Sequence, residues 1–296
     1  MINERVQGCI AETLTGKPLR SFREPIYIRN FAYGGIVSQK KKGEMKEDKM
    51  EKTEKYKLLG VLIRGFFEAF ASGIIDSEVA DAKEKFLPKT VKRVMLDHYE
   101  QISEAFHDTL FYPIAVMNFD YAEVERMVVE AHRQGTSMLE LVQQVCADER
   151  LYEALKAEYI RNFSLLLTGR FASAATHLDS YTRCEGEPSF VPSDDAIRLT
   201  VRTVMTAYAK GLRYAGKGKT SLHQASVFRL LVGAMQVLLS DELVTIDDAD
   251  GNDLALLFMK VCHSSHNFDT MTSAMDDVYG MLCESEGITA GDDSAN

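Results

Sequence analysis

The pair Glu104 and His107 has the types and spacing of metal ligands on a helix. Ferritin-like di-iron sites use two such Glu-x-x-His pairs on facing helices, and the sequence holds no second pair. The apolar residues of this segment centre on the opposite helix face. We therefore expect Glu100, Glu104 and His107 to face solvent without a metal, and the sequence predicts no cofactor.

A second group with ligand chemistry is Cys262, His263 and His266, which could supply two or three metal ligands or be ordinary helix-surface residues. The five cysteines lie far apart, and no Cys-x-x-Cys pair occurs. An odd number of widely spaced cysteines argues against a disulfide framework and a zinc ribbon. No nucleophile and base lie at a recognisable local spacing, which favours a protein without enzymatic activity.

Two loops approach known binding motifs and depart from them at required positions. The segment GKGKTS (216–221) resembles the end of a phosphate-binding loop, but Arg213 stands where that loop needs its first glycine. The segment DDADGND (247–253) approaches a calcium loop, but Ile246 and Leu257 stand at its first and twelfth positions, which require oxygen donors. Both loops are excluded as sites of those kinds.

The least ordinary feature of the chain is the stretch 196–240, which contains no Asp or Glu. At about 100° per residue, its apolar residues from Ile197 to Leu212 share one helix face, and its basic residues share a neighbouring face. The helix leads into a basic loop and then into an expected helix N-terminus, where free N–H groups favour an anion. The sequence thus predicts a phosphate or nucleic-acid site at Arg198, Arg202, Lys210, Arg213, Lys217, Lys219, Thr220 and Ser221.

Two other interpretations of this basic face remain open. Its side chains could pair internally with acidic helices of the same chain, or they could dock an acidic protein. Internal pairing predicts that replacing Arg202 and Arg213 by glutamate lowers thermal stability, and that no salt-dependent nucleic-acid binding occurs. Phosphate binding instead predicts that this double variant stays folded and stable, and that the protein binds nucleic acid in a salt-dependent way. Little preference for base sequence is then expected, because backbone contacts carry little base information.

The segment 17–39 has two prolines and a Gly-Gly pair, so it is expected to be an extended arm. We call it the N-terminal arm. Six apolar or aromatic side chains could anchor it to another chain or to another part of the same chain, which makes it the predicted oligomerisation element. These anchors are Phe22, Ile26, Tyr27, Ile28, Phe31 and Tyr33.

Charge is distributed unevenly along the 296 residues. The net charge is −10, but residues 1–57 hold 13 Lys/Arg and 8 Asp/Glu, so the remainder is strongly acidic. A uniformly acidic protein would repel nucleic acid, whereas two basic zones in an acidic body leave nucleic-acid binding open.

Beyond the arm, the apolar spacing is helical almost throughout, and the predicted fold is all-α, with about ten helices and two lobes as one arrangement. Residues 1–55 are expected to form the arm and a charged linker, 56–184 a first helical lobe, 193–283 a second lobe, and 284–296 an acidic disordered tail. Expected helices include 55–72, one starting near Asp76, and one from Pro88 to about Phe111. Others follow caps at Asp120, Thr136 or Ser137, Ser193, and Thr220 or Ser221.

The most apolar stretch, 58–75, carries Arg64 and Glu68 in its middle and is expected to be a core helix, not a membrane span. The N-terminus lacks the basic-then-apolar order of a signal peptide. These features predict a cytoplasmic protein, in its own cell or in a host cell, without membrane partners.

The segments FAYGG (31–35) and VLIRG (61–65) resemble early segments of phenuivirus nucleoproteins. The resemblance implies an all-helical fold, an N-terminal exchange arm and a basic RNA-binding cleft. It covers about ten of 296 residues, and the acidic body departs from that mostly basic family. It does not assign the chain to the family.

Taken together, the sequence favours a non-enzymatic nucleoprotein subunit that binds RNA or single-stranded nucleic acid through 198–219 and assembles through its arm. The alternatives are a helical adaptor, effector or scaffold that binds only proteins, and a helical enzyme whose site is assembled from dispersed residues.

Overall fold

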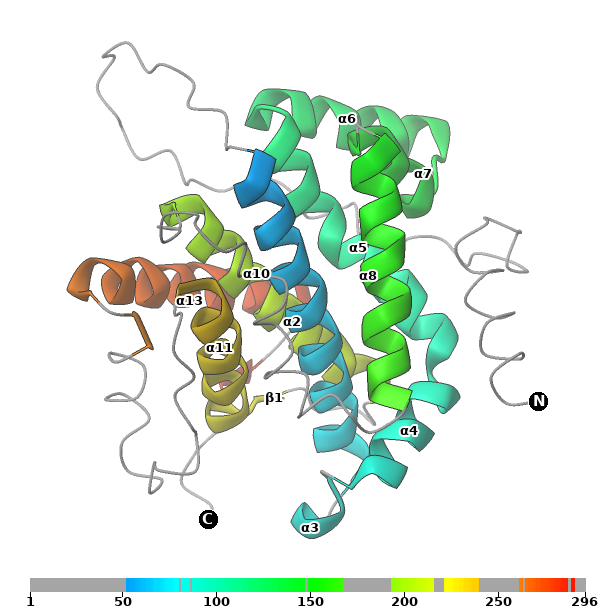
Figure 1. The fold of residues 1–296 in the computed structure, drawn as a ribbon, viewed down its shortest axis with the longest axis vertical. Helices are drawn as coiled ribbons and strands as arrows, with labels where there is room; N and C mark the ends of the chain where they lie inside the picture. Colours follow the sequence, from blue (N-terminus) through cyan, green and yellow to red (C-terminus); the bar gives the residue numbers. More distant parts are fainter. Residues whose placement is uncertain are drawn as a thin grey trace.

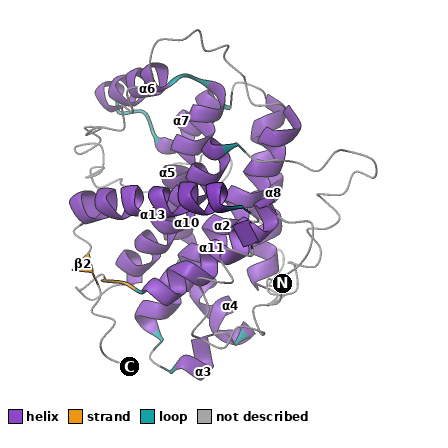
Figure 2. Ribbon diagram, turned by 90° about the vertical axis from the view of Figure 1, so that its left-hand side faces the viewer, coloured by secondary structure: helices purple, strands orange, loops and turns teal. Residues whose placement is uncertain are grey.

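A computed structural model of the chain describes residues 52–79, 81–85, 87–146, 149–167, 193–215, 221–239, 261–262, 264–286 and 289–290. Nearly all regular structure in these ranges is helical, which confirms the predicted all-α class (Figure 2). The predicted N-terminal arm, residues 185–192 between the two predicted lobes, and most of the predicted acidic tail lie outside the described residues.

Ten helices and two very short strands make up the described fold. In chain order they are α2 (Lys52–Glu78), α3 (Ala82–Lys85), α4 (Pro88–Asp97), α5 (Tyr99–Asn118), α6 (Tyr121–Gln134), α7 (Met138–Val145), α8 (Glu149–Leu167), α10 (Asp194–Ala215), β1 (Ser221–Leu222), α11 (Gln224–Leu239), α13 (Ser265–Glu286) and β2 (Thr289–Ala290).

The centre of the molecule is the crossing of α2 with α10 (Figure 1). Gly73 and Gly211 meet at this crossing. A Cβ added to Gly73 would lie 2.8 Å from the backbone N of Leu212, and one added to Gly211 would lie 3.1 Å from the Cα of Gly73. Without side chains there, the two backbones approach closely, as small residues permit at tight helix crossings.

Helices α4, α5 and α8 cover one side of this central pair, and α11 and α13 cover the other side (Figure 1). The rings of Phe66 and Phe67 on α2 pack with Phe106 on α5, at centroid distances of 5.3 and 5.8 Å. Tyr159 on α8 contacts both Phe67 and Phe106, and Phe70 stacks on Phe66. Buried residues from both predicted lobes form one hydrophobic core, since α2 and α10 belong to different lobes and share their largest interface.

Local capping signals placed several helix ends correctly. Asp120 accepts a hydrogen bond of 2.7 Å from the N–H of Glu123 and begins α6. Ser137 and Glu140 form a reciprocal capping box at the start of α7. Between them Gly135, with φ of 69°, ends α6 in the left-handed conformation that favours glycine.

Three expected boundaries were wrong. Helix α2 continues past the expected end near residue 72 to Glu78, and no helix starts at Asp76. The expected helix from Pro88 to Phe111 is two helices, which meet at His98. The second, α5, continues through Pro113 because its last turns bury Ile114 and Met117, and that burial outweighs the hydrogen bond that proline removes.

Candidate functional site

Three of the four basic residues predicted to share a face of α10 contact neighbouring helices. The ammonium group of Lys210 forms an ion pair with Asp108 on α5, and Lys210 is buried. The guanidinium of Arg202 lies 3.7 Å from the ring centroid of Tyr112, also on α5. Arg198 forms an ion pair of 3.6 Å with Asp277 on α13. These contacts join α10 to the helices on both of its flanks.

The arrangement follows from the helical repeat. Residues 198, 202 and 210 lie on one stripe of α10, and its neighbouring stripe buries Ile197 and Tyr208 against the core as predicted. The acids that the stretch 196–240 lacks are supplied in part by Asp108 and Asp277, far away in the sequence. The described contacts therefore fit the internal-pairing interpretation of the basic face.

Of the remaining residues of the predicted phosphate site, Arg213 and Ser221 lie in the described part of the chain. Arg213 is exposed near the end of α10, and Lys217, Lys219 and Thr220 lie outside the described residues. Ser221 belongs to β1, which pairs in parallel with β2, and α11 begins only at Gln224. The prediction that Ser221 caps this helix is thus wrong, because a short strand pairing takes its place.

An aromatic and polar cluster lies at the start of α6 and of α10. Loss of hydration at the Tyr121 phenol and the neighbouring Tyr112 and Asp195 raise its pKa to about 12, against the opposing effect of Arg202, although the residue as a whole is 64% exposed. The phenol is protonated near neutral pH, as an unshifted tyrosine also is, so the shift does not make it a base there. Beside this cluster, on the outer surface, Nε2 of His266 lies 2.8 Å from Oδ1 of Asp194.

His107 is buried, so the prediction that it faces solvent was wrong, whereas Glu100 and Glu104 are exposed as predicted. Its Nδ1 donates a hydrogen bond of 2.9 Å to the carbonyl oxygen of Ser103, and its Nε2 has no hydrogen-bond partner. Burial lowers the pKa of His107 to about 4, although the hydrogen bond to Ser103 opposes the shift. The side chain is therefore a neutral core residue.

This pKa predicts a loss of stability in mild acid. The folded protein keeps His107 neutral down to about pH 4, whereas an unfolded chain takes up a proton near 6.5. Stability should therefore fall by up to about 3 kcal/mol as the pH drops from 6.5 toward 4, at about 1.4 kcal/mol per pH unit. Denaturant titrations of His107→Gln should show a shallower acid slope than the wild type.

The matched control is His132→Gln, which changes an exposed histidine of α6. It should keep the wild-type slope between pH 6.5 and 4. Equal slopes for all three proteins would contradict the burial of His107.

A polar network around Asp76 joins four elements and was not predicted from the sequence. Lys85 donates to its Oδ1 at 2.9 Å, and the hydroxyls of Tyr208 and Ser226 each donate to its Oδ2 at 2.8 Å. Burial alone would raise the pKa of Asp76, but hydrogen bonds from Lys85, Ser226 and Tyr208 outweigh it and lower the pKa. The Asp76 carboxylate, near the end of α2, thus links this helix to three other elements through three hydrogen bonds.

Two buried thiols in the described ranges are chemically inert. Burial raises the pKa of the Cys146 thiol to about 12 and that of Cys262 to about 11, so neither forms a thiolate near neutral pH. Cys262 contacts Met271 in the core, at 3.9 Å between the sulfur atoms. Among the residues that the structure describes, no three His, Cys, Asp or Glu side chains come together as metal ligands.

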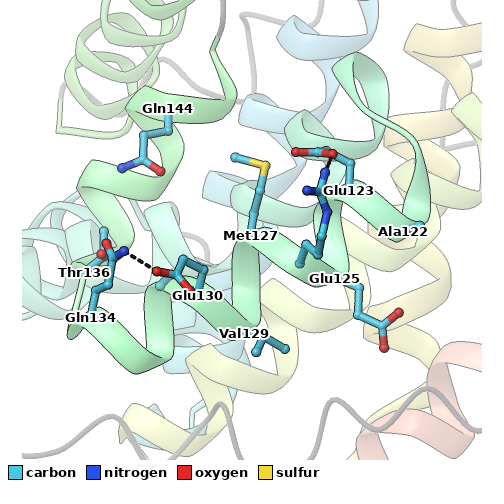
Figure 3. A pocket seen from close by; sticks show the side chains of 11 residues that line it. Ala122, Glu123, Glu125, Met127, Val129, Glu130, Gln134, Thr136 and Gln144 are labelled. Atoms are coloured by element: carbon cyan, nitrogen blue, oxygen red, sulfur yellow. Dashed lines mark hydrogen bonds and ion pairs between the residues drawn. The ribbon is translucent and has the colours of Figure 1, made fainter.

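A groove of about 640 Å³ runs along α6 and reaches α7 (Figure 3). In this view Met127 lies between Gln144 of α7 and Glu123 of α6. The lining residues are Ala122, Glu123, Glu125, Arg126, Met127, Val129, Glu130, Ala131, Gln134, Thr136 and Gln144. We call this the α6 groove.

Charge and apolar surface meet in the α6 groove. Glu123 pairs with Arg126. Hydrogen bonds from Arg133 and Gln134 lower the pKa of Glu130 and keep it ionised. Glu125 is exposed and has no ion-pair partner in the described part of the chain. Val129 is 64% exposed, which leaves an apolar contact point beside the acidic groups.

Positive charge without a partner lies elsewhere. Among the basic side chains placed in the described ranges, four have neither an ion pair nor a ring contact: Lys83, Lys89, Lys92 and Arg229. Three of them come from α3 and α4, at the end of the molecule opposite α6 (Figure 1).

Helix α2 is long and apolar enough to cross a membrane by length and composition, but 78% of its apolar window is buried inside the fold. This burial agrees with the prediction of a core helix.

Comparisons with protein-family models, with curated proteins and with solved structures found no match to this chain.

Proposed function

We propose that the protein is a non-enzymatic helical subunit that binds other proteins and assembles with copies of itself through its N-terminal arm. The observation that supports this choice over the nucleoprotein is the use of the α10 cations inside the fold. Lys210 is paired and buried, Arg202 stacks on Tyr112, and Arg198 pairs with Asp277. The charges of Lys210 and Arg198 can neutralise a phosphate backbone only if those two ion pairs break.

The chemistry of the described residues points in the same direction. Its buried thiols have raised pKa values and its buried histidine has a lowered one, so these groups are neutral at physiological pH. Enzymes instead tune such groups toward reactivity. The α6 groove, by contrast, presents both apolar and acidic surface to a partner.

The test is the oligomeric mass of a full-length variant in which Ile26, Ile28 and Phe31 are changed to serine, here called the arm variant. If these side chains anchor one copy to another, the variant should lose mass in light scattering, down to the single-chain value of 33.2 kDa. Far-ultraviolet circular dichroism should be unchanged. A variant with the wild-type oligomeric mass would refute assembly through the arm.

Nucleic-acid binding is the second candidate, and the unpaired charges of Lys83, Lys89, Lys92 and Arg229 favour it. Four phosphate contacts would give a log–log salt slope of about −3 on single-stranded RNA. Replacing Lys89 and Lys92 by glutamate would then weaken binding strongly, whereas a site at residues 198–221 would be little affected. The site at 198–221 remains a prediction. Comparing the Lys89 and Lys92 variant with the variant in which Arg202 and Arg213 are changed to glutamate distinguishes the two surfaces.

A further inference from the structure

The α6 groove is suited to a basic, partly apolar segment. Three carboxylates line it, and two of them are paired, Glu123 with Arg126 and Glu130 with Arg133, so the surplus negative charge is that of Glu125. Glu125 has no ion-pair partner among the residues that the structure describes, and Val129 offers exposed apolar surface four residues further along the same helix. An occupant that pairs with Glu125 and covers Val129 would satisfy both features.

The N-terminal arm has the complementary chemistry. Within residues 17–39 there are four basic residues and a single acidic one, Glu24, and Lys40, Lys41 and Lys42 follow directly. The same segment carries the six apolar anchors. Opposite charges at a groove and its ligand steer encounter and fix register, while the anchors supply the apolar contact.

The chain also enters the described fold beside the groove. Near the start of α2, Lys55 Nζ donates to Asn118 Oδ1 at 3.3 Å. Asn118 ends α5, two residues before Asp120 caps α6, so the start of α2 and the groove lie at the same end of the molecule (Figure 1). Residues 40–51 can span about 40 Å when extended, and α6 is about 21 Å long, so the arm reaches beyond its own groove.

We propose that the α6 groove receives the N-terminal arm of a second copy of the chain. This inference rests on the proposed self-assembly and supplies its acceptor surface. Because each arm is attached beside its own groove, two copies that meet through their α6 ends exchange arms reciprocally. Such a twofold exchange closes on itself and gives a dimer instead of an open filament.

The first test changes the groove in the full chain, with Glu125→Lys and Val129→Lys combined. The charge reversal and the lost apolar contact should raise the dimer dissociation constant by about tenfold or more, a loss of at least about 1.4 kcal/mol. The matched control combines Leu96→Lys with Glu104→Lys, which makes the same charge change at exposed positions on α4 and α5. The control should dimerise like the wild type.

The second test places a photoactivatable benzoylphenylalanine at position 129 of the full chain. Irradiation should give a covalent product of twice the chain mass, and peptide mapping should place the link in residues 17–42. Links confined within one chain, or a product mapped to another segment, would overturn the exchange.

The outcomes separate the acceptor surface from the assembly itself. A dimer that resists the groove variant but is lost in the arm variant would refute the α6 groove and leave the assembly proposal standing. A protein that is monomeric without any substitution would refute both.

Discussion

Replacing Gly211 by alanine is expected to destabilise the protein by about 3 kcal/mol, at the upper end of the roughly 1–3 kcal/mol that overpacking a tight contact usually costs. The new methyl group would overlap the carbonyl oxygen of Phe70 and lie 3.1 Å from the Cα of Gly73 and from the N of Ile74. These are backbone atoms, so a side-chain rotation cannot relieve the overlap. Either α2 and α10 separate, or their shared core is disrupted.

Thermal unfolding checks this expectation. For a domain of this size, about 3 kcal/mol corresponds to a Tm lowered by roughly 10 °C. The control is Gly60→Ala on α2, where an added Cβ meets no atom within 4 Å. That variant should gain up to about 1 kcal/mol, because alanine favours a helix more than glycine does. If Gly211→Ala melted at the wild-type temperature, the close crossing of α2 and α10 would be contradicted.

Replacing Asp76 by alanine should cost about 3 kcal/mol, since removing one member of a buried charged network leaves its partners without an acceptor. Lys85, Tyr208 and Ser226 all donate to this carboxylate, whose side chain is only 11% exposed. The loss would act on α2, α3, α10 and α11 together. A lowered midpoint in chemical denaturation, relative to the wild type, is the direct measurement.

The pH dependence gives this prediction a second signature. The pKa of Asp76 is lowered in the folded state, so its stabilisation is present above the ordinary value of 3.8 and disappears as the pH falls through the folded pKa. The stability difference between wild type and Asp76→Ala should therefore shrink in strong acid.

Asp97→Ala is the matched control for Asp76. Its carboxylate pairs with Arg93 at 3.5 Å on the surface, and exposed pairs contribute about 0–1 kcal/mol. If Asp76→Ala lowered the free energy of unfolding no more than Asp97→Ala does, the stabilising role of the Asp76 network would be contradicted.

The parts of the fold that the sequence predicted depend on neighbouring residues. Asp120 was recognised as a helix cap, and Ser137 as one of two candidates with Thr136, because a cap acts within three residues. The apolar face of α10 was recognised because its period belongs to the helix itself. Helix α5 was cut too short because the local preference of Pro113 gave no sign of the burial that carries the helix past it.

The candidate site could be predicted less well, because its contacts join distant residues. The pattern that located Arg202 and Lys210 on one face carried no information about Tyr112 and Asp108, which lie about a hundred residues away. His107 was placed in solvent because it lies beside exposed acids, although the helix turns it toward the core. The network of Asp76 depends on Ser226, 150 residues away, and no local pattern indicates it.

Self-assembly without nucleic acid is the central claim, and a single run of the purified full-length chain through size exclusion with light scattering and two-wavelength absorbance tests it. The chain has no tryptophan and only 12 tyrosines, so its absorbance at 280 nm is weak and bound nucleic acid would dominate the signal. The account predicts twice the chain mass of 33.2 kDa with the 260/280 nm ratio of pure protein. A single-chain mass, or a peak with a raised 260/280 nm ratio that persists at high salt, would contradict it.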